Sequence, residues 1–112
     1  MSSTLPNYLR TYRKKAGFTQ KETAFVLGLK SAGRISRYEN FSRLPNLKTA
    51  LAYEAIFRAP VRKLFAGVFE LVEKEVIKGA SELSKKLEKE NLNPALVRKL
   101  EILKAITCQK PN

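Results

Sequence analysis

The stretch from residue 19 to residue 45, TQKETAFVLGLKSAGRISRYENFSRLP, restricts the fold of this chain more than any other part of it. Thr19 and Glu22 have the spacing of a capping box, in which each side chain accepts a hydrogen bond from the other residue's backbone N–H. Gly28 then ends the first helix, because glycine adopts a positive φ at little cost. Ser31 is a suitable N-cap for a second helix. The stretch therefore predicts two short helices joined by a tight turn.

The second of these helices has an apolar face and an exposed basic face. Ile35 and Tyr38 lie on one side, because residues three or four apart are neighbours on a helix surface. The opposite side carries Gly33 and Arg37, with Arg34 on its flank. A short exposed helix with two arginines suits the major groove of DNA, where arginine binds O6 and N7 of guanine. This pattern indicates a helix-turn-helix.

The residues around this motif form an ordered set: Leu9, Arg13, Gly17, Phe18, Thr19, Gln20, Ala24, Leu27, Gly28, Leu29, Ile35, Ser36, Glu39, Asn40 and Pro45. The set resembles the phage repressor and Cro-like family, also called the XRE-type helix-turn-helix family, and the likeness runs from about residue 5 to residue 65.

The chain departs from the family pattern twice. Gly28 is seven steps from Ile35 where the family has six, which leaves the recognition-helix register open by one residue. Phe41 replaces the family's glycine, so we expect Asn40 to be the left-handed residue that closes the helix.

The resemblance and the helix pattern together suggest which residues contact DNA. For reading bases we single out the exposed first turns of the second helix: Ala32, Gly33, Arg34 and Arg37. Gln20 and Lys21 are candidates for binding phosphate because free N–H groups and the helix dipole favour an anion at a helix start. The resemblance adds Ser31, Asn40, Ser42 and Arg43 as phosphate contacts, and Lys30 in the longer turn joins them.

The resemblance also implies a buried ion pair between Arg13 and Glu39, which would link the first helix to the recognition helix. The alternative is two solvated charges that stabilise the fold little.

Composition restricts the class of protein. The net charge of +12 is uneven: residues 1–66 hold thirteen Lys and Arg against three Glu, whereas residues 67–112 hold nine against seven. A basic first part beside a nearly balanced second part is typical of a nucleic-acid-binding domain with a different appendage.

The single cysteine, Cys108, and the absence of histidine exclude cysteine–histidine nucleophile pairs and the common zinc sites. We therefore expect no enzyme, no cofactor and no metal. A carboxylate- or lysine-based enzyme stays formally possible, although no spacing supports one.

No apolar run approaches the roughly 20 residues that span a bilayer, and the N-terminus lacks a secretory signal. We expect a cytoplasmic protein of a bacterium or phage, with no membrane partner.

The fold class expected is all-α: a five-helix, repressor-like DNA-binding domain over residues 1–66, followed by a helical hairpin over residues 67–112. The first helix should cover residues 5–15, and the fourth should begin after an Asn46 cap with Leu47, Ala50, Leu51 and Ala55 facing inward. A long helix follows over residues 68–89, and Asn93 with Pro94 should start the last one. The long helix carries a stripe expected to bind a second copy or a partner protein: Val68, Val72, Val76, Leu83 and Leu87. The stripe of the last helix is Leu96, Leu100, Leu103 and Ile106.

These features predict a sequence-specific regulator that binds double-stranded DNA, a repressor acting as a homodimer on a palindromic operator. Two alternatives stay open. One is an antitoxin-type autoregulator whose C-terminal helices bind a toxin, and the other is a coactivator-like module that docks a protein. The last helix also has two possible positions, in a dimer interface or folded back on the DNA-binding domain.

Overall fold

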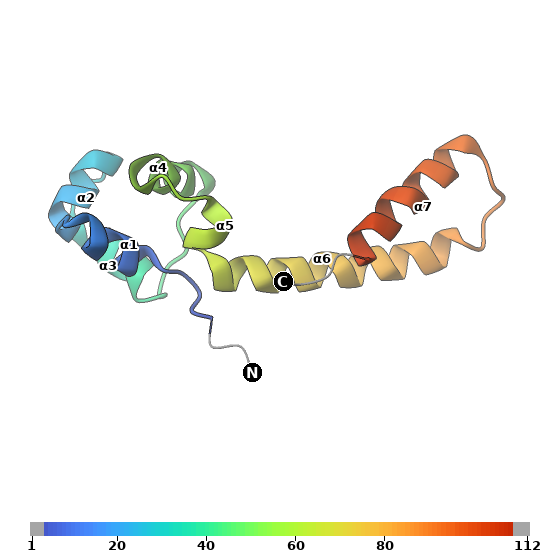
Figure 1. The fold of residues 1–112 in the computed structure, drawn as a ribbon, viewed down its shortest axis with the longest axis horizontal. Coiled ribbons are helices and arrows are strands. Elements are labelled where there is room, and N and C mark those ends of the chain that lie inside the picture. Colours follow the sequence, from blue (N-terminus) through green and yellow to red (C-terminus); the bar gives the residue numbers. More distant parts are fainter. Residues whose placement is uncertain (1–3, 109–112) are drawn as a thin grey trace. The chain divides into compact units, whose positions relative to one another are not determined.

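The computed structural model describes residues 4–108, and these residues form seven helices and no strand (Figure 1). The helices are α1 (Leu9–Ala16), α2 (Gln20–Leu27), α3 (Ala32–Glu39), α4 (Leu47–Phe57), α5 (Val61–Leu64), α6 (Ala66–Leu87) and α7 (Pro94–Thr107). The all-α prediction, with five short helices before two longer ones, is confirmed.

The chain divides into two compact units, Met1–Phe69 and Glu70–Asn112, which we call the head and the tail. The boundary between them falls inside α6. The expected division after residue 66 stays a prediction, because a separation of contacts does not establish that either part folds alone.

The head is built around fully buried side chains from four helices. Leu9 of α1, Ile35 of α3 and Leu64 of α5 have no exposed surface. Tyr53 of α4 lies among them, with its ring 6.0 Å from that of Phe57 and edge-on to that of Phe65 at 6.5 Å. Aromatic pairs at these distances add to the stabilisation that burial gives. This core fixes α3 against α1 and α4.

In three of the helices the side chain of the N-cap residue itself accepts a hydrogen bond from the first turn. The predicted capping box of α2 is confirmed: Thr19 accepts from the N–H of Glu22 at 3.0 Å, and Glu22 accepts from the N–H of Thr19 at 2.8 Å. The Asn46 side chain accepts from the N–H of Thr49 at 2.9 Å at the start of α4. Asn93 caps α7 in the same way, with Pro94 in the first turn as predicted.

The expected end of α3 is wrong. Asn40 has φ −94°, and Phe41 is the left-handed residue with φ 69°. The N–H of Phe41 donates to the carbonyl of Tyr38, and the N–H of Ser42 donates to that of Arg37. These two bonds define a Schellman motif, which needs its left-handed residue one position after the cap. The geometry of the motif therefore outweighs the preference of asparagine for this conformation.

Two further expectations about the head are wrong. The first helix begins at Leu9, because the carbonyls of Leu5 and Pro6 accept from the N–H groups of Gly67 and Val68 instead of forming a helical turn. In the fourth helix the expected burial of Ala50 is confirmed, but the other inward residue is Tyr53, and three residues expected inside are exposed: Leu47, Leu51 and Ala55.

The tail holds most of α6 and all of α7, which turns back after the loop that follows Leu87 (Figure 1). Among its described residues, Ala80, Leu87 and Leu96 are buried. Leu100, Leu103 and Ile106 of α7 are half-buried, as are Ile77 and Ser84 of α6. The spacing 77, 80, 84 and 87 is that of a coiled-coil seam, so α7 packs on this side of α6.

Candidate nucleic-acid interface

The helix-turn-helix consists of α2, a turn over residues 28–31, and α3. Ala24 of α2 and Ile35 of α3 are both buried and hold the two helices together. The longer step from Gly28 to Ile35 is therefore accommodated without exposing Ile35. Ser31 occupies the N-cap position in an extended conformation, but its side chain accepts no capping hydrogen bond from α3.

The expected base-reading residues lie on the solvent-facing side of α3. Gly33, Arg34 and Arg37 are exposed, and Ala32 is half-buried. Arg34 also borders a shallow hollow that the turn residues line, including Lys30 and Ser31. It therefore lies on the turn side of the helix.

The expected phosphate-binding residues fall into two groups. Lys21, Lys30 and Ser31 are exposed around α2 and the turn. Gln20 is half-buried, because its Nε2 donates to Oε1 of Glu39 at 3.1 Å. The amide nitrogen has a second N–H, so Gln20 can donate to an anion through this N–H or through its backbone N–H.

The second group follows α3 and is held in place by hydrogen bonds. Asn40, Ser42 and Arg43 are exposed. Oδ1 of Asn40 accepts from the N–H of Ser42 at 3.0 Å, and Oγ of Ser42 donates to the carbonyl of Arg37 at 3.3 Å. These bonds leave the amide group of Asn40 as a donor and orient the loop before a ligand arrives.

Arg13 and Glu39 form an ion pair beneath this surface. Nη2 of Arg13 donates to Oε1 of Glu39 at 3.0 Å, its Nε donates to Oε2, and its Nη1 donates to the carbonyl of Phe18 at 2.9 Å. Both residues are 8% exposed. The hydrogen bonds to Glu39 raise the pKa of Arg13, although burial alone would lower it. The pair joins α1 to the C-terminal end of α3 and so fixes the angle of the exposed helix.

A buried residue outside the predicted site, Asn7, supports α3. Asn7 is 5% exposed, its Nδ2 donates to the carbonyl of Tyr38 at 2.9 Å, and its Oδ1 accepts from the N–H of Leu9 at 3.1 Å. An asparagine shortly before an apolar helix is a cap signal. The bond to Tyr38 has no local signal, because it joins residues 31 positions apart.

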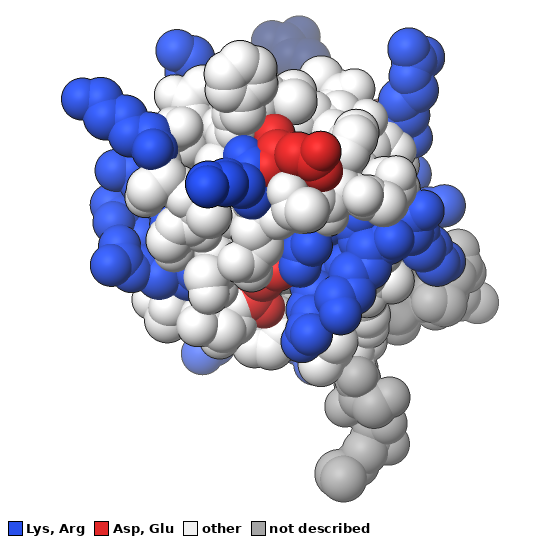
Figure 2. Space-filling model, turned by 90° about the vertical axis from the view of Figure 1, so that its left-hand side faces the viewer, with Lys and Arg blue, Asp and Glu red and all other residues white. Residues whose placement is uncertain are grey.

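Positive charge surrounds the part of the head that carries α1, α2 and α3. Figure 2 shows Lys and Arg side chains at many places on this side and only small areas of Asp and Glu. An excess of cationic groups attracts the phosphate backbone regardless of sequence.

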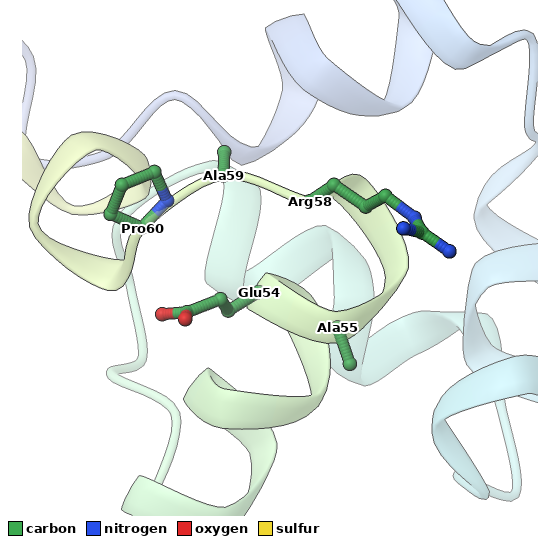
Figure 3. Close-up of a pocket in the computed structure, with 5 residues that line it drawn as sticks. All are labelled: Glu54, Ala55, Arg58, Ala59 and Pro60. Atoms are coloured by element: carbon green, nitrogen blue, oxygen red, sulfur yellow. The ribbon is translucent and has the colours of Figure 1, made fainter.

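A second hollow lies at the turn between α4 and α5, lined by Glu54, Ala55, Arg58, Ala59 and Pro60 (Figure 3). Oε1 of Glu54 accepts from the N–H of Val61 at 2.8 Å and so caps α5. Its carboxylate is therefore committed to the fold. Within residues 4–108 there is no group of three His, Cys, Asp or Glu side chains that could hold a metal ion.

These features define a helix-turn-helix DNA-binding protein. A family model described as "Helix-turn-helix" matches residues 9–64, which is half of the chain. The chain belongs to that family, the XRE/Cro-like regulators, and is a DNA-binding transcriptional regulator whose partner is double-stranded DNA. The family is typically non-enzymatic.

Comparisons with curated proteins and with solved structures gave no significant match. In the part of the chain that the structure describes, no helix has the length and apolar character to cross a membrane.

Proposed function

We propose that this regulator is a repressor that acts as a homodimer. It would occupy a palindromic operator and so block polymerase from the DNA. The observation that carries the proposal is the exposed basic side of α3, with Arg34 and Arg37 open to solvent on a strongly basic head. Such a helix fits the major groove, and a head of this size contacts one half-site.

Base reading is assigned to Arg37 first. It lies on the side of α3 away from Ile35, and its guanidinium can bond O6 and N7 of guanine together. Arg34, on the turn side, reaches a neighbouring base or a phosphate. Ala32 meets a thymine methyl group, and Gly33 lets the backbone approach the groove floor.

Phosphate binding is assigned to the residues on either side of α3: Gln20, Lys21, Lys30, Ser31, Asn40, Ser42 and Arg43. The ordered loop after α3 supports this assignment, since donors held in place before binding lose less entropy when they bind.

Only part of the stripe expected on α6 can form the dimer surface. Leu87 is buried within the tail, and Val68 packs against the head core, so neither is available to a partner. Val72, Val76 and Leu83 remain, each between 44% and 49% exposed. Their spacing of four and seven residues places them along one line of the helix. Burying this line against a second copy is favourable by about 25 cal/mol per Å² of apolar area.

The test begins with selection of DNA sites from a random-sequence library by the full-length protein. We expect the selected sites to contain two inverted half-sites whose centres lie about one helical turn, or a multiple of it, apart. Affinity should fall with salt by roughly 0.9 logarithmic units per phosphate neutralised. A promoter that carries the site across its start should be silenced when the protein is expressed. Asymmetric selected sites, or affinity that does not depend on salt, would contradict the proposal.

A further inference from the structure

Three consecutive helices of the head end in the same motif but with different residues at its left-handed position. At the end of α1, Gly17 has φ 84° and the N–H of Phe18 donates to the carbonyl of Arg13. At the end of α2, Gly28 has φ 76° and the N–H of Leu29 donates to the carbonyl of Ala24. At the end of α3 the same position is Phe41, at φ 69°. A side chain other than glycine, and an aromatic one above all, is strained in this conformation.

Burial in the core does not explain why a phenylalanine occupies this position. Phe41 is 46% exposed and does not belong to the buried core of the head. Strained residues that persist without a packing reason cluster at functional sites. The position of Phe41, between Asn40 and Ser42 on the loop after α3, therefore points to a role on the DNA-facing surface.

Phe41 borders a hollow between α1, the first residue of α2 and the end of α3. Arg10 and Tyr8 line it from the α1 side, Gln20 from α2, and Ser36 and Asn40 from α3. Arg13 and Glu39 also line it, but their charges compensate each other. Arg10 therefore gives the hollow its net positive charge, and the rings of Tyr8 and Phe41 give it an apolar edge.

We propose that this hollow, which we call the Phe41 hollow, receives one sugar–phosphate unit of bound DNA. Arg10 and the amide group of Asn40 bind the phosphate, and the ring of Phe41 packs on the deoxyribose. A nucleic-acid backbone presents an anionic phosphate beside an apolar sugar face, which matches the combination of groups in the hollow. Of these residues, Gln20 and Asn40 also belong to the phosphate-binding set proposed above, so the hollow continues that surface.

The inference rests on the proposed DNA binding and adds to it a contact that is independent of base sequence. It explains why strain is retained at Phe41: glycine would relieve the strain but would lose the contact. The competing explanation is that the ring packs on Leu5 and Tyr8, which line the same hollow, and so holds the N-terminal segment.

The test replaces Phe41 with glycine and, separately, with asparagine, which both adopt a positive φ easily. We expect Phe41→Gly and Phe41→Asn to melt at the temperature of the parent or above it. Both should bind a mixed-sequence duplex and the selected operator about ten-fold more weakly, because apolar contact with the sugar is lost. The slope of affinity against salt should not change, because no charge is removed. A lower melting temperature in both variants, or unchanged affinity, overturns the proposal.

Arg10→Gln tests the phosphate contact. It should weaken binding to the same two duplexes and lower the salt slope by about 0.9, and an unchanged slope would exclude Arg10 from the contact. The matched control is Phe25→Ala, which removes an 85% exposed phenylalanine on α2 that does not line the hollow, and its affinity should equal that of the parent. If the parent itself does not bind the duplexes, the proposed function fails. If the parent binds and the Phe41 variants bind as tightly as the parent, this inference fails and the proposed function stands.

Discussion

The head and the tail differ in how much apolar surface each of them hides. In the head, Leu9, Ile35, Tyr53 and Leu64 are completely buried, and a charged pair is buried with them. In the tail, Ala80, Leu87 and Leu96 are buried, while Val72, Val76 and Leu83 of the same unit remain exposed among its described residues. A unit of about forty residues rarely buries enough surface to be stable without a disulfide, a metal or another chain. The head has a buried core of its own, whereas we expect the tail to be stable only with a partner.

The largest effect should come from breaking the head at its ion pair. Arg13→Met leaves Glu39 charged and buried, and we expect the free energy of unfolding to fall by about 3–5 kcal/mol. Replacing both residues with apolar ones should recover much of the loss. Urea unfolding of the parent, the single variant and the double variant measures this. A single variant as stable as the parent would show that the pair contributes nothing.

The next effect should separate the tail from the head. Val76→Asp places a charge in the proposed interface of each copy. We expect the dissociation constant of the dimer to rise by about 100-fold or more. Leu71→Asp is the matched control, because Leu71 is 60% exposed but lies on another side of α6. Light scattering reports the oligomeric state, and binding to a single half-site should be the same for both variants. Equal dissociation of the two variants would contradict the interface.

A smaller effect should change specificity in the head without touching the tail. Arg37→Ala should cost about 1–3 kcal/mol on the preferred site and relax preference at one or two base pairs. Arg43→Ala should weaken all sequences alike, since a phosphate contact carries no base information. Titrations against single-base variants of the selected site compare the two. Identical, sequence-independent losses would mean that the register of α3 in the groove is wrong.

The smallest effect concerns a defect in the head core. The hydroxyl of Tyr53 is buried and has no hydrogen-bond partner among the described residues. We expect Tyr53→Phe to stabilise the head by about 1 kcal/mol, because it removes an unsatisfied polar group. Thermal and urea unfolding measure the change. A clear loss of stability would mean that the hydroxyl has a partner such as a bound water.

The same residue should make the parent sensitive to alkali. Burial raises the pKa of Tyr53 in the folded chain above its ordinary value. Deprotonation is therefore easier in the unfolded chain, and stability present below about pH 10 should fall as pH rises further. Tyr53→Phe should reduce this loss relative to the parent in urea unfolding at several pH values.

The sequence by itself determined the helices, their order and most of their caps. Thr19 with Glu22, Asn46, and Asn93 with Pro94 act on N–H groups within a few residues, so their effect can be read without knowing the fold. The family pattern added the pairing of Arg13 with Glu39, which no local spacing reveals. Helical spacing, and not the family pattern, indicated which side of α3 faces solvent.

Only the tertiary structure decided which apolar faces are covered. Leu47 and Leu51 have helical spacing that fits a buried face, yet both are exposed, and the core takes Tyr53 beside the expected Ala50. On α6 the apolar stripe divides, because α7 covers the line through Ala80 and Leu87 and leaves Val76 exposed. Periodicity states that a face is apolar, but the neighbour that covers it comes from a distant part of the chain. Phe41 shows the same limit: its left-handed conformation follows from how α3 ends, and not from the preference of phenylalanine.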